Sequence, residues 1–102
     1  GADGKFLWPG FGDNLRVLSW VIDRCEGRAQ AQETPIGYLP RKEDLDIQAL
    51  GLPDETVHQL LGLDHAAWHR EIDEVGKYLE EYGTRLPPAL RAQYQKVKQA
   101  LG

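Results

Sequence analysis

The most informative stretch of the sequence is Phe6-Leu7-Trp8-Pro9-Gly10-Phe11-Gly12-Asp13-Asn14. It places three large aromatic residues within six positions and interrupts them with a Pro-Gly turn. Core helices and strands repeat their apolar residues at a regular period, and this stretch does not. Glycine lets a ligand approach the backbone closely, and proline stiffens the turn before binding. The pattern indicates either a ligand-contacting loop or a loop whose rings fill a gap beneath it.

The ligand that would suit such a loop is a planar heteroaromatic ring. Aromatic side chains on a stiff turn offer flat faces for stacking. Asn14 follows the second glycine and supplies a side-chain amide, which is both a donor and an acceptor. Stacking by the rings and edge reading by the amide would together bind a base.

This stretch is followed by Arg16-Val17-Leu18, Trp20 and Thr34-Pro35-Ile36-Gly37-Tyr38-Leu39-Pro40, and together they resemble the C-terminal segment of GTP-dependent phosphoenolpyruvate carboxykinase. The resemblance is strong up to Pro40 and looser in the helical remainder. It implies that Phe6 and Phe11 stack about the guanine ring and that Asn14 reads its edge. Asp13 stands where many relatives have glutamate, a change that should not touch the clamp.

The resemblance also implies an activity for a longer parent enzyme. That activity is the gluconeogenic conversion of oxaloacetate and GTP to phosphoenolpyruvate, CO2 and GDP, with Mn2+ or Mg2+ bound by residues upstream. The expected partners are GTP or GDP and the rest of the parent chain, in a monomer. No catalytic or metal-binding residue of the family falls in this segment, so it should be inactive alone.

Composition agrees with a part of an intracellular enzyme. The chain has 102 residues, a formal charge of −4 and a pI near 5.3, which argues against nucleic acid or an anionic membrane as partner. No apolar run reaches transmembrane length and no signal peptide opens the sequence. The single cysteine, Cys25, fits a reducing compartment such as the cytoplasm and is interpreted as an inert helix residue.

The expected fold is a mainly α segment of about four helices with a short extended entry, completing an α/β nucleotide-binding domain in the parent. We divide it into a clamp loop and helix at 1–27, a connecting region with a short helix at 28–62 and a helical hairpin at 63–102.

In the first part, residues 6–8 are expected to be extended and to belong to a sheet whose other strands are missing from this segment. Asp13 or Asn14 should cap a helix that runs to about Glu26 and stops at Gly27. The wide apolar face of this helix predicts burial on more than one side. We expect Trp8 to pack around the clamp. Arg16 is expected to form a surface ion pair, with contact to an anion at the start of the helix as the alternative.

In the connecting region, the two prolines of 34–40 exclude a helix and predict an extended or turn segment, in which Tyr38 packs. A charged, solvated connection follows at 41–46. Leu45, Ile47 and Leu50 then point toward the core, and Pro53 opens the first turn of a short helix.

Two further helices are expected to form the antiparallel hairpin. Asp64 should cap the first, and apolar residues recur at spacings of three and four in both. Asp73 and Lys77 should pair on its outer face. His65 and His69 lie four apart, with His58 nearby, but Ala66 replaces the glutamate of the zinc-protease motif, so we interpret them as surface residues.

Two other functions remain possible on the residues alone. The chain could be a free-standing helical interaction module whose aromatic loop grips a peptide, or a structural C-terminal cap. A natural reading frame that continued upstream into a glycine-rich phosphate-binding loop would favour the enzyme.

Overall fold

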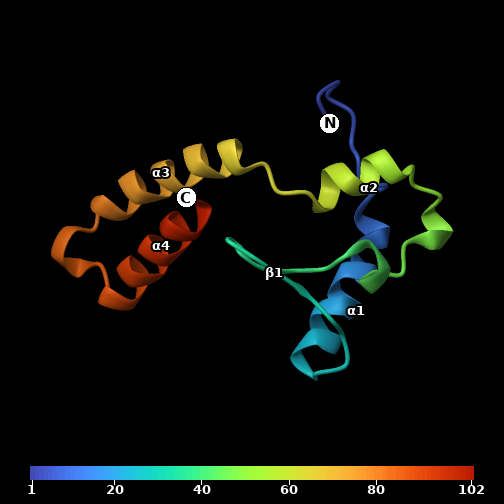
Figure 1. The fold of residues 1–102 in the computed structure, drawn as a ribbon, viewed down its shortest axis with the longest axis horizontal. Helices are drawn as coiled ribbons and strands as arrows, with labels where there is room; N and C mark the ends of the chain where they lie inside the picture. Colours follow the sequence, from blue (N-terminus) through green and yellow to red (C-terminus); the bar gives the residue numbers. More distant parts are fainter. The chain divides into compact units, whose positions relative to one another are not determined.

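The computed structural model describes residues 1–102, which divide into two compact units. The first unit comprises Gly1–Thr34 and Tyr38–Gly62, and the second comprises Leu63–Gly102 with Pro35–Gly37. The chain is mostly helical, as expected, and it also contains a small two-stranded sheet (Figure 1). The elements are α1 (Asn14–Cys25), β1 (Gln32–Thr34), β2 (Gly37–Leu39), α2 (Asp54–Leu61), α3 (His65–Glu80) and α4 (Pro88–Leu101).

The predicted extended run at residues 6–8 is wrong. The chain bends at Leu7 and Trp8, and the sheet contains only β1 and β2. An extended segment becomes a strand only when a neighbouring strand pairs with its backbone groups, and no strand lies beside this one. The entry therefore holds the aromatic residues on an irregular loop.

Helix α1 begins at Asn14, directly after a 3-10 turn at Phe11–Asp13. Asp13 occupies the capping position, but its side chain makes no capping hydrogen bond. Its carboxylate instead accepts from Nε of Arg16 at 3.2 Å, so the prediction of a capping side chain is wrong here. The 3-10 turn takes over part of that role, because the backbone N–H of Asn14 donates to the carbonyl of Phe11.

Helix α1 ends where Gly27 predicts. The N–H of Gly27 donates to the carbonyl of Arg24 at 3.2 Å, and the N–H of Arg28 donates to the carbonyl of Asp23 at 2.8 Å. These two bonds form a Schellman motif, which requires a left-handed residue between the helix and the following chain. Gly27 supplies it with φ of 76°.

The apolar face of α1 is open within this chain, contrary to the expectation of burial. Leu15 is 67% exposed and Ile22 is 55% exposed, and α1 contains no buried residue. The pattern of the sequence is that of a covered helix, but covering it needs a partner surface that these 102 residues do not provide.

The core of the first unit forms where the connecting region returns to α2. Leu45, Ile47 and Val57 are buried, as predicted for the first two. Around them pack five partly buried residues: Trp8, Trp20, Leu50, Leu52 and Leu61. The predicted helix starts one residue later than expected, because Pro53 is at its capping position. The core thus ties the aromatic loop to α2.

The hairpin between β1 and β2 agrees with the predicted extended segment. Pro35 and Ile36 form its turn, and Gly37 follows with φ of 129°. Tyr38 does not pack into a core as predicted, since it is 58% exposed. Its ring lies under the guanidinium of Arg24, 5.2 Å from the ring centroid.

In the second unit, α3 and α4 pack against each other (Figure 1). Asp64 caps α3 as predicted, its Oδ1 accepting from the N–H of Ala67 at 2.9 Å. Gly76 permits the close approach of the helices, because a Cβ there would lie 2.4 Å from the hydroxyl oxygen of Tyr94. The apolar spacing of the sequence predicts neither this role of Gly76 nor its contact with Tyr94.

Polar contacts also join α3 and α4. Nζ of Lys98 lies 2.9 Å from Oδ1 of Asp73, and Lys77 pairs with Glu74 at 2.7 Å, so the predicted pair of Asp73 with Lys77 is wrong. The partner of Asp73 comes from α4 because packing brings that helix within reach. His69, interpreted from sequence as a surface residue, is half-buried and bonds through Nε2 with the carbonyl of Leu101 at 2.9 Å.

Candidate functional site

The candidate site consists of Phe6, Phe11 and Asn14, and all three side chains are exposed. Phe6 is 97% exposed and Phe11 is 90% exposed. Large apolar rings this open contribute nothing to the core of the chain. The rings of Phe6 and Phe11 therefore do not fill a gap beneath the loop, which was the alternative interpretation of the motif.

The backbone of the loop is fixed by two hydrogen bonds at the start of α1. The N–H of Asp13 donates to the carbonyl of Gly10 at 3.1 Å, and the N–H of Asn14 donates to the carbonyl of Phe11. A Cβ added at Gly10 or Gly12 would meet no atom within 4 Å. The glycines therefore leave open space beside a defined main chain.

Phe11 and Asn14 lie along one open apolar cavity of about 530 Å³. The cavity is lined by Phe11, Gly12, Asn14, Leu15, Val17 and Leu18. Phe6 does not line it. The structure thus brings together two of the three predicted residues and leaves the third outside their cavity.

Asn14 is held by a contact that the sequence analysis missed. Nε1 of Trp8 donates to Oδ1 of Asn14 at 3.0 Å. Sequence analysis assigned Trp8 to packing around the clamp, and its ring does pack against the core. The indole N–H of a half-buried tryptophan needs a hydrogen-bond acceptor. That requirement is the one feature of the sequence that could have indicated a contact between Trp8 and Asn14.

A second apolar cavity of about 280 Å³ lies on the core side of the same amide. Its lining includes Trp8, Asn14, Leu45, Ile47 and Val57. Asn14 therefore lines both cavities, one beside Phe11 and one beside the core.

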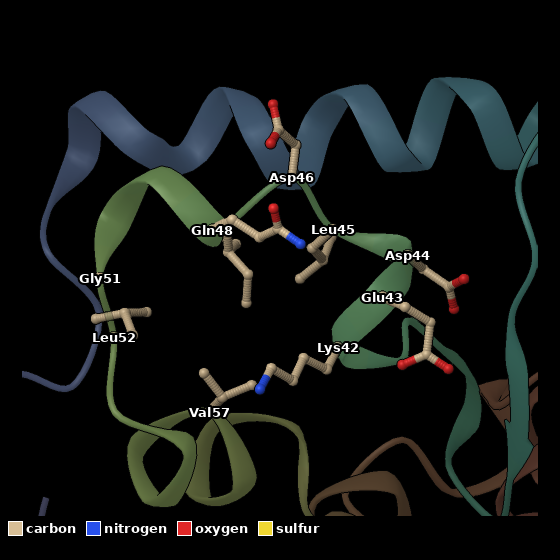
Figure 2. Close-up of a pocket in the computed structure, with 10 residues that line it drawn as sticks. Lys42, Glu43, Asp44, Leu45, Asp46, Gln48, Gly51, Leu52 and Val57 are labelled. Atoms are coloured by element: carbon tan, nitrogen blue, oxygen red, sulfur yellow. The ribbon is translucent and has the colours of Figure 1, made fainter.

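A further cavity, of about 690 Å³, contains none of the predicted site residues. Figure 2 shows it between the connecting region and α2, with Lys42 reaching toward Val57. Lys42 forms an ion pair with Asp54, and the Lys42 ammonium lowers the pKa of the Asp54 carboxyl through that hydrogen bond. The charges around this cavity are thus compensated within the chain.

Arg16 is also compensated, which agrees with the predicted surface ion pair. Its guanidinium lies 3.2 Å from Oδ1 of Asp13 and 3.6 Å from Oδ2 of Asp46. It also donates to the carbonyl of Asp46. Two carboxylates and a carbonyl take up the cation, so a phosphate would have to displace them.

No group of three or more histidine, cysteine, aspartate or glutamate side chains is placed to hold a metal ion. Cys25 is exposed. No helix is both long enough and apolar enough to cross a membrane. The fold and the site define a mainly helical segment with an exposed aromatic and amide surface, whose groups at Phe11 and Asn14 are chemically able to stack and to form hydrogen bonds.

Comparison with known proteins identifies the family. The family described as "Phosphoenolpyruvate carboxykinase C-terminal P-loop domain" matches residues 1–100, and the chain belongs to that family. It is 44% identical over 101 residues to "Phosphoenolpyruvate carboxykinase [GTP]" of Renibacterium salmoninarum, covering 99% of the chain and 17% of the relative.

Two other relatives of the same name give similar values. The protein from Corynebacterium glutamicum strain R is 45% identical over 98 residues, which is 96% of the chain and 16% of the relative. The protein from Neocallimastix frontalis is 43% identical over 100 residues, which is 97% of the chain and 16% of the relative. The chain therefore spans about a sixth of the length of the curated relatives it matches.

Proposed function

We propose that this chain is the guanine-recognising C-terminal part of a GTP-dependent phosphoenolpyruvate carboxykinase. The reaction of the whole enzyme would convert oxaloacetate and GTP to phosphoenolpyruvate, CO2 and GDP. The observation that carries the proposal is the exposed pair of Phe11 and Asn14 along one apolar cavity, in a chain that belongs to this family.

Phe6 and Phe11 would stack on the base. Base–aromatic stacking contributes about 1 to 3 kcal/mol per base in single-strand binders and hardly depends on which base is bound. The exposure of both rings leaves their faces available. Phe6 would reach the base from outside the cavity beside Phe11, since it does not line that cavity.

Asn14 would read the edge of the base. Guanine presents an acceptor at O6 and donors at N1 and N2, whereas adenine presents a donor at N6 and an acceptor at N1. A fixed set of protein groups therefore cannot satisfy both bases. The mismatched base would leave buried polar groups unpaired, at a cost of about 1 to 3 kcal/mol each.

The remaining parts of the enzyme would surround this segment. The open apolar face of α1 would pack against the rest of the parent chain, which would also hold the phosphates, the Mn2+ or Mg2+ and the oxaloacetate. Val21 and Ile22 are exposed, do not line the cavity beside Phe11 and would be covered in this way. The expected protein is monomeric and cytoplasmic, in keeping with its single cysteine.

Nucleotide binding by the full-length enzyme tests the proposal. Asn14→Ala should weaken the binding of GTP and reduce the preference for GTP over ATP. Phe11→Ala should weaken the binding of both nucleotides to the same extent. Dissociation constants for GTP and ATP, measured calorimetrically without oxaloacetate, give the comparison. Tyr38→Ala serves as a control, because Tyr38 is exposed but contacts Arg24 rather than the cavity. Unchanged GTP binding in both site variants would place guanine recognition elsewhere.

A further inference from the structure

Trp8 connects the buried core to the candidate base reader. Its ring packs against the cluster of Leu45, Ile47 and Val57. Its Nε1 donates to Oδ1 of Asn14 at 3.0 Å. Asn14 is also the first residue of α1, and its backbone N–H donates a hydrogen bond to the carbonyl of Phe11. Both the backbone and the side chain of Asn14 are therefore held in place.

The indole bond determines which end of the amide faces a ligand. An indole N–H only donates, and of the two amide ends only the oxygen accepts. Exchanging Oδ1 and Nδ2 of Asn14 would place a donor against the donor of Trp8 and break the bond. The amide therefore offers a ligand its Nδ2 donor and the second lone pair of Oδ1, in a fixed order.

We propose that Trp8 sets the base specificity of this site by locking the Asn14 amide in one orientation. The proposal rests on the function proposed above, in which Asn14 reads guanine. A free amide turns over and then matches either the acceptor–donor order of guanine or the donor–acceptor order of adenine. A locked amide matches one order and leaves unpaired polar groups against the other. Trp8 is thus a positioning residue that acts through Asn14.

The first experiment is Trp8→Phe in the full-length enzyme. Phenylalanine keeps an aromatic ring in the core contact and removes the N–H. The ratio of ATP to GTP dissociation constants should fall by about tenfold, the effect of one mispaired polar group. A purely structural loss would weaken both nucleotides and leave the ratio unchanged.

Trp20→Phe is the matched control. Trp20 packs against the same core cluster, and its Nε1 donates to the carbonyl of Gln30 at 3.0 Å. The substitution removes the same atoms and the same kind of bond but does not touch Asn14. Its ratio of dissociation constants should equal that of the unsubstituted enzyme. A shift equal to that of Trp8→Phe would overturn the proposal, because it would show a general response to loosening the core.

A double-mutant cycle tests whether Trp8 acts through Asn14. In an Asn14→Ala background, Trp8→Phe should leave the ratio unchanged, because no amide remains to be oriented. An equal fall in the ratio with and without the amide would overturn the proposal.

Asn14→Asp gives a test that keeps Trp8 intact. A carboxylate still accepts the indole bond, but it offers an acceptor where Nδ2 offered a donor. Asn14→Asp should weaken the binding of GTP more than that of ATP and so lower the ratio of the ATP to the GTP dissociation constant. Retention of the full GTP preference would overturn the lock. If Asn14→Ala itself leaves the ratio unchanged, the proposed function fails as well, whereas an effect of Asn14→Ala without one of Trp8→Phe rejects the lock alone.

Discussion

At the scale of single residues, the loop combines two properties that rarely occur together. Phe11 is almost fully exposed, yet the backbone that carries it is fixed by the 3-10 turn and by the start of α1. Burial against a core usually fixes an aromatic residue, but here hydrogen bonds of the main chain fix the segment instead. Binding would therefore cost little backbone entropy.

Gly12 provides a prediction at this scale. Its backbone does not have a positive φ, and a Cβ there would meet no atom of the chain within 4 Å. Gly12→Ala should therefore leave the melting temperature unchanged or raise the stability by about 0.4 to 1 kcal/mol. It should weaken GTP, because the added methyl group would project beside the cavity where the base is proposed to bind.

Calorimetric melting and GTP titration of the full-length enzyme check both parts. Gly4→Ala is not a suitable control, since Gly4 has φ of 78° and alanine there would be strained. Ser19→Ala on α1 is a better one, because Ser19 does not line the cavity of Phe11 and Asn14. GTP binding unaffected by Gly12→Ala would mean that the base does not approach this part of the loop.

At the scale of elements, α1 and the helical hairpin differ in how they find partners. The apolar residues of α3 are met by those of α4, and Ile72 and Leu101 are buried. Gly76 has no side chain, and Tyr94 of α4 occupies the space where a Cβ at that position would lie. The hairpin thus satisfies its own pattern, whereas α1 leaves its apolar face open.

The ion pair of Asp73 and Lys98 gives a pH prediction for the hairpin. The hydrogen bond from Lys98 lowers the pKa of Asp73, and that from Asp73 raises the pKa of Lys98. A lowered carboxyl pKa contributes stability above its unfolded value, about 3.9, and loses it as the pH falls through the folded value. A raised lysine pKa contributes below its unfolded value, about 10.4, and loses it at higher pH.

Hydrogen exchange of α4 should report this pair. At pH 7, the amides of α4 should exchange faster in Asp73→Asn than in the unsubstituted protein. The difference should shrink as the pH falls below about 3.9 and through the lowered pKa of Asp73 in the folded state. Glu74→Gln is the control, since Glu74 pairs with Lys77 on the same helix and does not join α3 to α4. A difference that stayed the same size as the pH was lowered would mean that Asp73 acts by packing rather than by charge.

At the scale of the whole molecule, the proposed base-binding surface lies in a chain that corresponds to a small part of its relatives. No cluster of metal-ligating side chains is present, and the cation of Arg16 is already taken up by carboxylates. The chain corresponds to 17% of the length of a matched relative. Recognition of the base and chemistry at the phosphates would thus be separate tasks of separate segments.

The isolated chain is therefore predicted to have no carboxykinase activity. Purified chain mixed with oxaloacetate, GTP and Mn2+ should form no phosphoenolpyruvate in an enzyme-coupled assay, while the full-length enzyme at the same concentration should form it. Turnover that disappears with Asn14→Ala would contradict the prediction, because it would show that the chain itself carries the reacting groups.

The sequence by itself determined the features that depend on neighbouring residues. The stop at Gly27, the cap at Asp64, the extended segment before Pro40 and the return of Leu45 and Ile47 to the core all follow from local backbone preference or apolar spacing. The aromatic loop was also evident, because glycine, proline and exposed rings are informative without knowledge of any partner.

Tertiary structure alone decided the features that need residues distant in the chain or missing from it. Asp73 pairs with Lys98 rather than Lys77, His69 bonds with Leu101, and Trp8 holds Asn14. The extended run at residues 6–8 failed as a prediction, and the apolar face of α1 stays open in this chain, for a related reason: a strand needs a neighbouring strand and a wide apolar face needs a partner surface. Local pattern states that a partner is needed, and only the packed chain shows which group provides it.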